Sequence, residues 1–149
     1  MTYFNQGTIK LSKLKDFDVA KSITIDLRNT PDLAQTIAVT CLGLGIGCKL
    51  SGLHTLKIKE TDRLSALKIE MEKFGSKVDI TSNSLELYPN SKLKNNIAID
   101  TYNDHRMAMA FAPLAIKVPI IINDSSVVSK SYPTFWDDLK SIDFVREMI

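Results

Sequence analysis

The sequence has little of several features that would assign it to a special class of protein. Its 149 residues include only two cysteines and two histidines, and none of them cluster at the spacing of a zinc site. The net charge is +2, from 19 lysines and arginines against 17 acids. This excess is too small to indicate a nucleic-acid partner, and no run of basic residues suggests one. We therefore expect neither a metal nor a nucleic acid.

Long hydrophobic runs are also missing. The longest apolar stretch, near residues 37–46, is interrupted by Thr40 and by glycines, so no transmembrane helix is expected. The first residues have neither the basic nor the apolar part of an export signal. Cys41 and Cys48 are then expected to be buried free thiols in a reducing cytoplasm, with a disulfide or a metal pair as the less favoured alternative.

What is present is typical of a globular protein, with 44% hydrophobic and 24% charged residues. The length suits one ordinary domain or two small repeated units. Alternating and helical hydrophobic periods predict the elements and their order. Strands are expected at residues 7–11, 23–27, 48–53, 77–80, 84–88, 97–100 and 118–123, and helices from residue 30, over 62–74, from 104 and from about 131. Pro113 predicts a kink or an early end of the third helix.

This order indicates an α/β (α+β) protein made of repeated β-α-β-α-β-β units. Residues 22–90 form one complete unit, residues 1–21 the last strand of a preceding unit plus a connection, and residues 91–149 a following, truncated unit. The chain therefore resembles a piece of a repeat architecture.

Two charged stretches, at residues 57–63 and 103–106, run into predicted helices. In the first, Lys57 and Lys59 alternate with the apolar Leu56 and Ile58, which indicates a strand or an extended segment before the helix. Thr61 or Asp62 caps the helix whose first turn holds Arg63. In the second stretch, Asn103 or Asp104 caps the helix, and its first turn holds Arg106. Backbone N–H groups and a guanidinium can converge on one anion at such a helix start. Two basic helix starts favour a ligand with more than one anionic group, although each could also be a solvated helix end.

Four short runs resemble the 5-enolpyruvylshikimate-3-phosphate (EPSP) synthase family. They are Thr-Pro-Asp at 30–32, Lys-Glu-Thr-Asp-Arg-Leu at 59–64, Tyr-Asn-Asp-His-Arg-Met-Ala-Met at 102–109, and Ser-Lys-Ser-Tyr-Pro at 129–133. The resemblance covers about residues 7–142. It implies the inside-out, barrel-like α/β fold of the enolpyruvyl transferases. It also implies that this chain is a fragment of the second domain, whose partner would be the missing amino-terminal part of the same enzyme.

The resemblance also implies a reaction. The enolpyruvyl group of phosphoenolpyruvate is transferred to the 5-hydroxyl of shikimate 3-phosphate through a tetrahedral intermediate, and phosphate is released. This step belongs to the shikimate pathway, in chorismate and aromatic amino-acid biosynthesis, and needs no metal or organic cofactor. Phosphate and carboxylate groups require Arg and Lys, and protonation of the methylene carbon requires a carboxylic acid.

Several residues take roles by this resemblance. Arg63, Arg106 and Lys130 would bind phosphoenolpyruvate. Glu60 would donate a proton to the methylene carbon, and Lys59 would contact the shikimate hydroxyls and stabilise the developing alkoxide. Without the resemblance, these side chains would read as solvated charges at helix and strand ends.

Supporting and divergent positions complete the prediction. Asp62 would cap a helix and pair with a nearby cation, while Asp104 and His105 would orient Arg106 and the start of its helix. The resemblance leads us to expect an acid two residues before the Pro-Asp pair, where this chain has Asn29, which cannot act as a base. Either Lys59 takes that role or catalysis is weakened. Thr55 replaces an expected asparagine contact to shikimate 3-phosphate.

Two other interpretations stay open. The related transferase that acts on UDP-N-acetylglucosamine shares the fold, but neither charged run resembles that branch. A non-catalytic anion-binding module is also possible, because one wall of the site is missing. We expect the chain alone to be inactive, and to associate through strand edges or apolar faces that a longer chain would cover.

Overall fold

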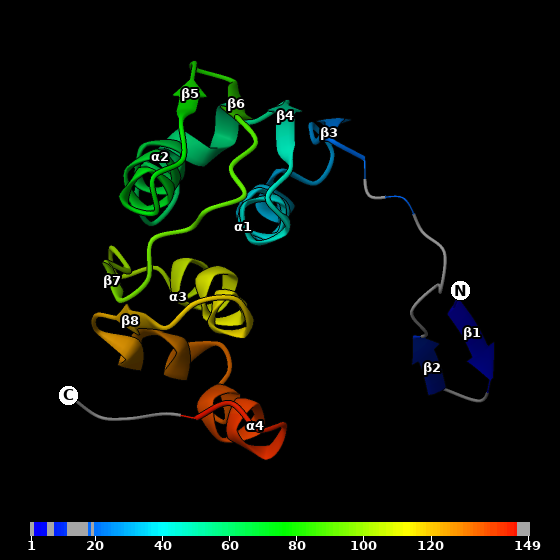
Figure 1. Cartoon of the computed structure of the whole chain (residues 1–149), viewed down its shortest axis with the longest axis vertical. Coiled ribbons are helices and arrows are strands. Elements are labelled where there is room, and N and C mark those ends of the chain that lie inside the picture. The colour runs from blue at the N-terminus through cyan, green and yellow to red at the C-terminus, as the bar shows by residue number, and fades with distance from the viewer. Residues whose placement is uncertain (1, 6–7, 12–17, 19, 146–149) are drawn as a thin grey trace.

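The computed structural model describes residues 2–5, 8–11, 18 and 20–145 (Figure 1). At the amino terminus, β1 (Thr2–Asn5) and β2 (Thr8–Leu11) form an antiparallel pair. The second strand corresponds to the one expected at residues 7–11, whereas β1 was not predicted. The expected connection at residues 12–17 and 19 lies outside the described residues.

A four-stranded sheet follows, with strand order β3-β4-β6-β5. Its strands are β3 (Ser22–Asp26), β4 (Gly47–Ser51), β5 (Val78–Ile80) and β6 (Ser84–Leu87). The β3–β4 pair is parallel, while β4–β6 and β5–β6 are antiparallel. This part of the chain shows the β-α-β-α-β-β order expected for residues 22–90. That these residues form one unit of a repeat stays a prediction.

Two helices cover one face of this sheet (Figure 1). Helix α1 (Ala34–Leu44) contacts β4 and β6, and α2 (Arg63–Lys73) contacts β5. The apolar residues of α2 recur at helical spacing, and Leu64, Leu67 and Met71 are fully buried. Helix α2 therefore has the bounds and the buried face that its sequence predicts.

The first helix begins differently from the prediction. Pro31–Leu33 form a 3₁₀ turn, η1, before α1, and the Thr30 side chain makes no capping hydrogen bond. A second 3₁₀ helix, η2 (His54–Ile58), occupies the stretch where alternating Leu56 and Ile58 suggested a strand or extended segment. That expectation was wrong, because Leu56 is fully buried while Ile58 is 83% exposed, so the two do not share a face.

The last part of the chain packs below α1 (Figure 1). Strands β7 (Ile97–Ile99) and β8 (Ile120–Ile122) form a parallel pair. Helix α3 (His105–Phe111) contacts α1 and becomes a 3₁₀ helix, η3 (Ala112–Ile116), which confirms the early end expected near Pro113. A 3₁₀ helix, η4 (Ser125–Lys130), then precedes α4 (Phe135–Ser141), and η4 was not predicted.

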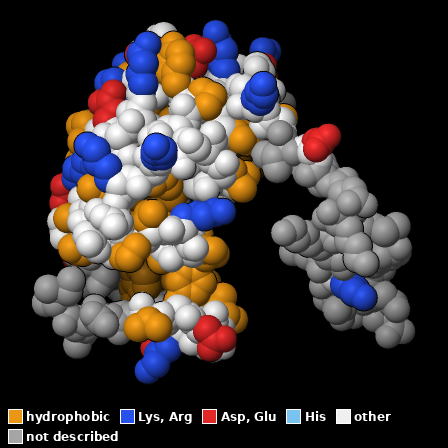
Figure 2. All heavy atoms as spheres, viewed as in Figure 1, with side chains coloured by type: hydrophobic (Ala, Val, Ile, Leu, Met, Phe, Trp, Pro, Cys, Tyr) orange, Lys and Arg blue, Asp and Glu red, His pale blue; other side chains and the backbone are white. Residues whose placement is uncertain are grey.

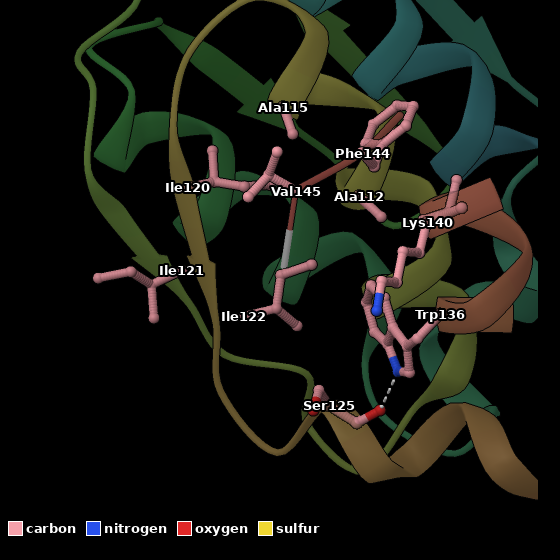
Figure 3. Close-up of a pocket in the computed structure, with 11 residues that line it drawn as sticks. Ala112, Ala115, Ile120, Ile121, Ile122, Ser125, Trp136, Lys140, Phe144 and Val145 are labelled. Atoms are coloured by element: carbon pink, nitrogen blue, oxygen red, sulfur yellow. Dashed lines mark hydrogen bonds between the residues drawn. The ribbon is translucent and has the colours of Figure 1, made fainter. Parts of the chain in front are cut away.

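A pocket of about 160 Å³ lies between β8 and α4 (Figure 3). The Trp136 indole Nε1–H donates to the Ser125 carbonyl oxygen at 2.9 Å on one side of it. Phe144 and Val145 lie against the pocket from the other side. Most of its lining residues are apolar, and none of them belongs to the two charged stretches.

The distribution of surface charge and the state of the two cysteines agree with what the sequence leads us to expect. In Figure 2, lysines and arginines are scattered over the half of the molecule that carries α2, β5 and β6, with no single basic patch on that face. Cys41 and Cys48 are buried free thiols, as expected. Among the residues that the structure describes, no helix has both the length and the apolarity that a membrane span requires.

Candidate active site

The segments at the starts of three helices meet at one place. Asp32 lies in η1 before α1, and Glu60 lies between η2 and α2. Arg63 is the first residue of α2, and Arg106 lies in the first turn of α3. These segments are far apart in the sequence, but ion pairs join them directly. The two charged stretches singled out in the sequence therefore form a single site.

Arg63 is the centre of this site, and its side chain is 1% exposed. Its Nε–H donates to Asp104 Oδ2 at 2.6 Å, and one Nη1–H donates to Asp32 Oδ1 at 3.0 Å. Its Nη2 group donates to Glu60 Oε2 at 2.6 Å and to Asp104 Oδ1 at 3.3 Å. Four of its N–H donors are thus engaged by carboxylates, which is the planar, forked pairing that arginine favours.

Asp104 holds the second charged stretch in place. Its carboxylate is fully buried, pairs with Arg63, and accepts a hydrogen bond from the Arg106 backbone N–H at 2.9 Å. It therefore caps α3, as predicted. It supports Arg106 through the backbone, whereas its side-chain partner is Arg63. His105 is partly buried, with Nδ1 at 4.0 Å from Asp104 Oδ1.

Asp32 is the functional candidate that the sequence reasoning missed. In the sequence it stood out only as part of the Thr-Pro-Asp run at the start of a predicted helix, yet its carboxylate lies among three cations. Oδ1 is 3.0 Å from Arg63 Nη1 and 3.5 Å from Lys59 Nζ, and Oδ2 is 3.7 Å from Arg106 Nη2. Its place in the Pro-Asp pair, inside one of the four recognised runs, was the available signal.

The site is open to solvent on one side. The side chains of Asp32, Lys59 and Arg106 are 36–41% exposed, and that of Glu60 is 49% exposed, so an incoming ligand can reach all four. Together with Arg63 and Asp104 they are three cations and three carboxylates, and their charges cancel. An anion would therefore meet cations that are already paired.

Four predicted residues stand outside this network. Asn29 lies in an exposed turn before η1, and Lys130 is exposed at the end of η4, which packs against α3. Within the described part of the chain, no ion pair joins Lys130 to the cluster. The Thr55 hydroxyl is buried without a hydrogen-bond partner among the described residues. Their roles stay predictions.

Asp62 is the fourth, and its capping role is confirmed. Its carboxylate accepts hydrogen bonds from the Ser65 backbone N–H at 3.1 Å and from the Ser65 hydroxyl at 2.9 Å. Its expected cation partner is not observed among the described residues.

In the part of the chain that the structure describes, no group of three or more His, Cys, Asp or Glu side chains is placed to hold a metal ion.

Comparison with known proteins shows which family this chain belongs to. The family model for EPSP synthase (3-phosphoshikimate 1-carboxyvinyltransferase) matches residues 6–139. A 3-phosphoshikimate 1-carboxyvinyltransferase of Bacteroides fragilis is 48% identical over 146 residues, which cover 96% of this chain and 35% of that protein. One from Neisseria meningitidis is 34% identical over 140 residues, or 93% of this chain and 32% of that protein.

The fold agrees with these matches. An EPSP synthase structure from Acinetobacter baumannii, at 2.37 Å, superposes with a TM-score of 0.65 over 72% of this chain and 26% of that one, at 22% identity. The α/β fold inferred from the order of elements is thereby confirmed. The chain belongs to the EPSP synthase family. It spans about a third of the length of the curated relatives that it matches.

Proposed function

We propose that this chain forms part of an enzyme that transfers the enolpyruvyl group of phosphoenolpyruvate to the 5-hydroxyl of shikimate 3-phosphate and releases phosphate. The observation that carries the proposal is the convergence of Asp32, Lys59, Glu60, Arg63 and Arg106 on one partly exposed site. The reaction needs cations for two anionic substrates, a carboxylic acid and a base, and these residue types meet here.

The geometry suggests a role for each side chain. Arg106 is the exposed arginine of the site and would bind phosphate or carboxylate oxygens of phosphoenolpyruvate. Arg63 would reach the ligand only after exchanging one of its carboxylate partners. Glu60, half-exposed beside Arg63, would protonate the methylene carbon. Lys130, beside α3, would add a further cation to the same ligand.

Asp32 is the candidate base, in place of Asn29. Its carboxylate lies 3.5 Å from the Lys59 ammonium, so a hydroxyl within hydrogen-bond reach of both groups could lose its proton to Asp32 while Lys59 stabilises the alkoxide. Asn29 could still donate a hydrogen bond to the ring of shikimate 3-phosphate. This assignment keeps Lys59 in the charge-stabilising role that its ammonium suits.

The chain alone is proposed to bind phosphoenolpyruvate weakly and not to turn it over. Its cations are already neutralised by three carboxylates, and about two thirds of the relative's sequence has no counterpart in these residues. Closure of a second domain over such a site commonly completes it and excludes water. The separate chain would therefore act only as a non-catalytic anion-binding module.

The buried free thiols favour a cytoplasmic location.

The test is a chimera in which this chain replaces the matching region of the Bacteroides fragilis relative. We expect phosphate release from shikimate 3-phosphate plus phosphoenolpyruvate by the chimera and none by the chain alone. Lys59→Ala should abolish most of the activity, and Lys57→Ala, an exposed lysine outside the cluster, should not. Equal activity of these two variants would contradict the assigned site.

Asp32→Asn separates binding from chemistry. Removing the carboxylate frees Lys59 and Arg106, so the separate chain should bind phosphoenolpyruvate two- to fivefold more tightly, or about 0.5–1 kcal/mol for a partly exposed ion pair. The chimera carrying the same change should release phosphate much more slowly, because it lacks the base. Calorimetric titration and the phosphate assay measure the two effects. Unchanged turnover would remove Asp32 from the base role.

A further inference from the structure

Glu70 is a buried carboxylate that the proposed reaction does not use. It lies seven residues after Arg63, two turns along the same buried face of α2, and it is fully buried. Its Oε1 accepts a hydrogen bond from the Tyr102 hydroxyl at 2.7 Å, and its Oε2 accepts one from the Asp100 backbone N–H at 3.2 Å. Lys73 Nζ lies 2.7 Å from the same carboxylate.

These contacts hold the turn that leads into α3. Tyr102 and Asn103 have φ of +54° and +56°, and two consecutive non-glycine residues in the left-handed region are strained. The turn is tied to α2 at both ends: at Tyr102 by Glu70, and at Asp104 by Arg63. Such a conformation persists only where its surroundings determine it, and here α2 supplies the determining contacts.

The Tyr102 hydroxyl remains a donor over the working range of pH. Burial, together with its hydrogen bond to Glu70, raises the pKa of Tyr102 above its ordinary value. The contact therefore does not depend on small changes in pH. It is a fixed link between α2 and the segment that carries Arg106.

We propose that Glu70, acting through the Tyr102 hydroxyl, is a positioning residue that sets the place of Arg106 in the site. This inference rests on the proposed function, in which Arg106 binds an anionic group of phosphoenolpyruvate. Without the Tyr102 contact the strained turn relaxes, and the first turn of α3 shifts with it. Arg106 then loses its alignment with Asp32 and with the ligand, and a shift on the ångström scale weakens such contacts strongly.

The first experiment uses the 149-residue chain itself and follows the Arg106 Nε–H resonance by NMR. Tyr102→Phe should move this resonance and weaken phosphoenolpyruvate binding roughly tenfold. Glu70→Gln keeps an oxygen that can accept from Tyr102, so it should have a smaller effect on both. The matched controls are Tyr88→Phe, just after β6, and Glu72→Gln on the exposed side of α2, and neither should change the resonance or the affinity.

The second experiment distinguishes positioning from a merely structural role. In the chimera, Tyr102→Phe should raise KM for phosphoenolpyruvate by more than it lowers kcat. A loss of folded protein would lower the maximal rate at unchanged KM, and that result would overturn the proposal. An unmoved Arg106 resonance in folded Tyr102→Phe would also overturn it. If the unsubstituted chimera is inactive, the proposed function fails, whereas the NMR result still decides whether Glu70 and Tyr102 position Arg106.

Discussion

Arg63 is a cation at a position that solvent hardly reaches, so the stability of the folded chain depends on the carboxylates that pair with it. Asp104, its shortest partner, is fully buried as well. A buried ion pair contributes little over an apolar pair, but removal of one partner leaves an uncompensated buried charge. The structural importance of Arg63 should therefore exceed that of any exposed arginine.

Arg63→Ala is expected to lower the free energy of unfolding by about 3–5 kcal/mol, because it leaves Asp104 buried without a cation. Urea unfolding at neutral pH measures this loss. Arg28→Ala is the matched control, since Arg28 pairs with Asp26 at an exposed position and its removal should change stability little. Similar effects of the two substitutions would show that Asp104 is stabilised by other groups.

At the scale of elements, Asp100 ties three segments together at the end of β7. Its carboxylate accepts hydrogen bonds from the Asn123 side-chain amide at 2.7 Å, just after β8, and from Lys73 of α2 at 3.0 Å. These contacts lower the pKa of Asp100 below its ordinary value of 3.8, the Asn123 hydrogen bond most strongly and the Lys73 ammonium next. The carboxylate thus stabilises the fold in its ionised form.

The stabilisation by Asp100 should be lost in acid. Because its folded-state pKa is the lower one, the contribution is complete above the ordinary value and disappears as pH falls through the folded-state value. We expect the stability difference between the natural chain and Asp100→Asn to shrink from about pH 6 to about pH 3. Denaturant unfolding at several pH values measures it. A difference that stays constant with pH would contradict this role.

At the scale of the whole molecule, the chain exposes apolar side chains around the β7–β8 pair. Ile116, Ile142 and Val145 are 64–88% exposed and line a hollow beside β8. Contiguous exposed apolar surface favours association, and so does a two-stranded sheet whose outer edges pair with no other strand among the described residues. We therefore expect association to occur through the exposed apolar surface beside β8.

Purified chain is expected to associate as its concentration rises, which light scattering detects. Ile116→Lys should reduce this association, because it places a charge within the hollow. Ile58→Lys changes an even more exposed isoleucine in η2, outside the hollow, and serves as the control. A monodisperse monomer at all concentrations would contradict the prediction.

The sequence pattern predicted the elements whose conformation is set by neighbouring residues, such as helix caps, apolar periods and prolines. Helix α2 follows from its periodic apolar residues and the Asp62 cap, and α3 ends early near Pro113 as expected. At residues 56–58 the alternation of apolar and charged residues indicated a strand or extended segment, and that prediction was wrong. The segment is a 3₁₀ helix in which Leu56 is buried and Ile58 is exposed. Short segments carry too few residues for their own period to decide their conformation.

The sequence by itself determined the order of the elements, the two basic helix starts and the family resemblance, because caps, periods and motifs are written within a few neighbouring residues. Only the tertiary structure decided the pairing of charges. Arg63 became a buried centre rather than an open ligand contact, and Asp32 joined Lys59 and Arg106. The partners come from segments tens of residues apart, and local pattern does not record which distant carboxylate a cation will meet.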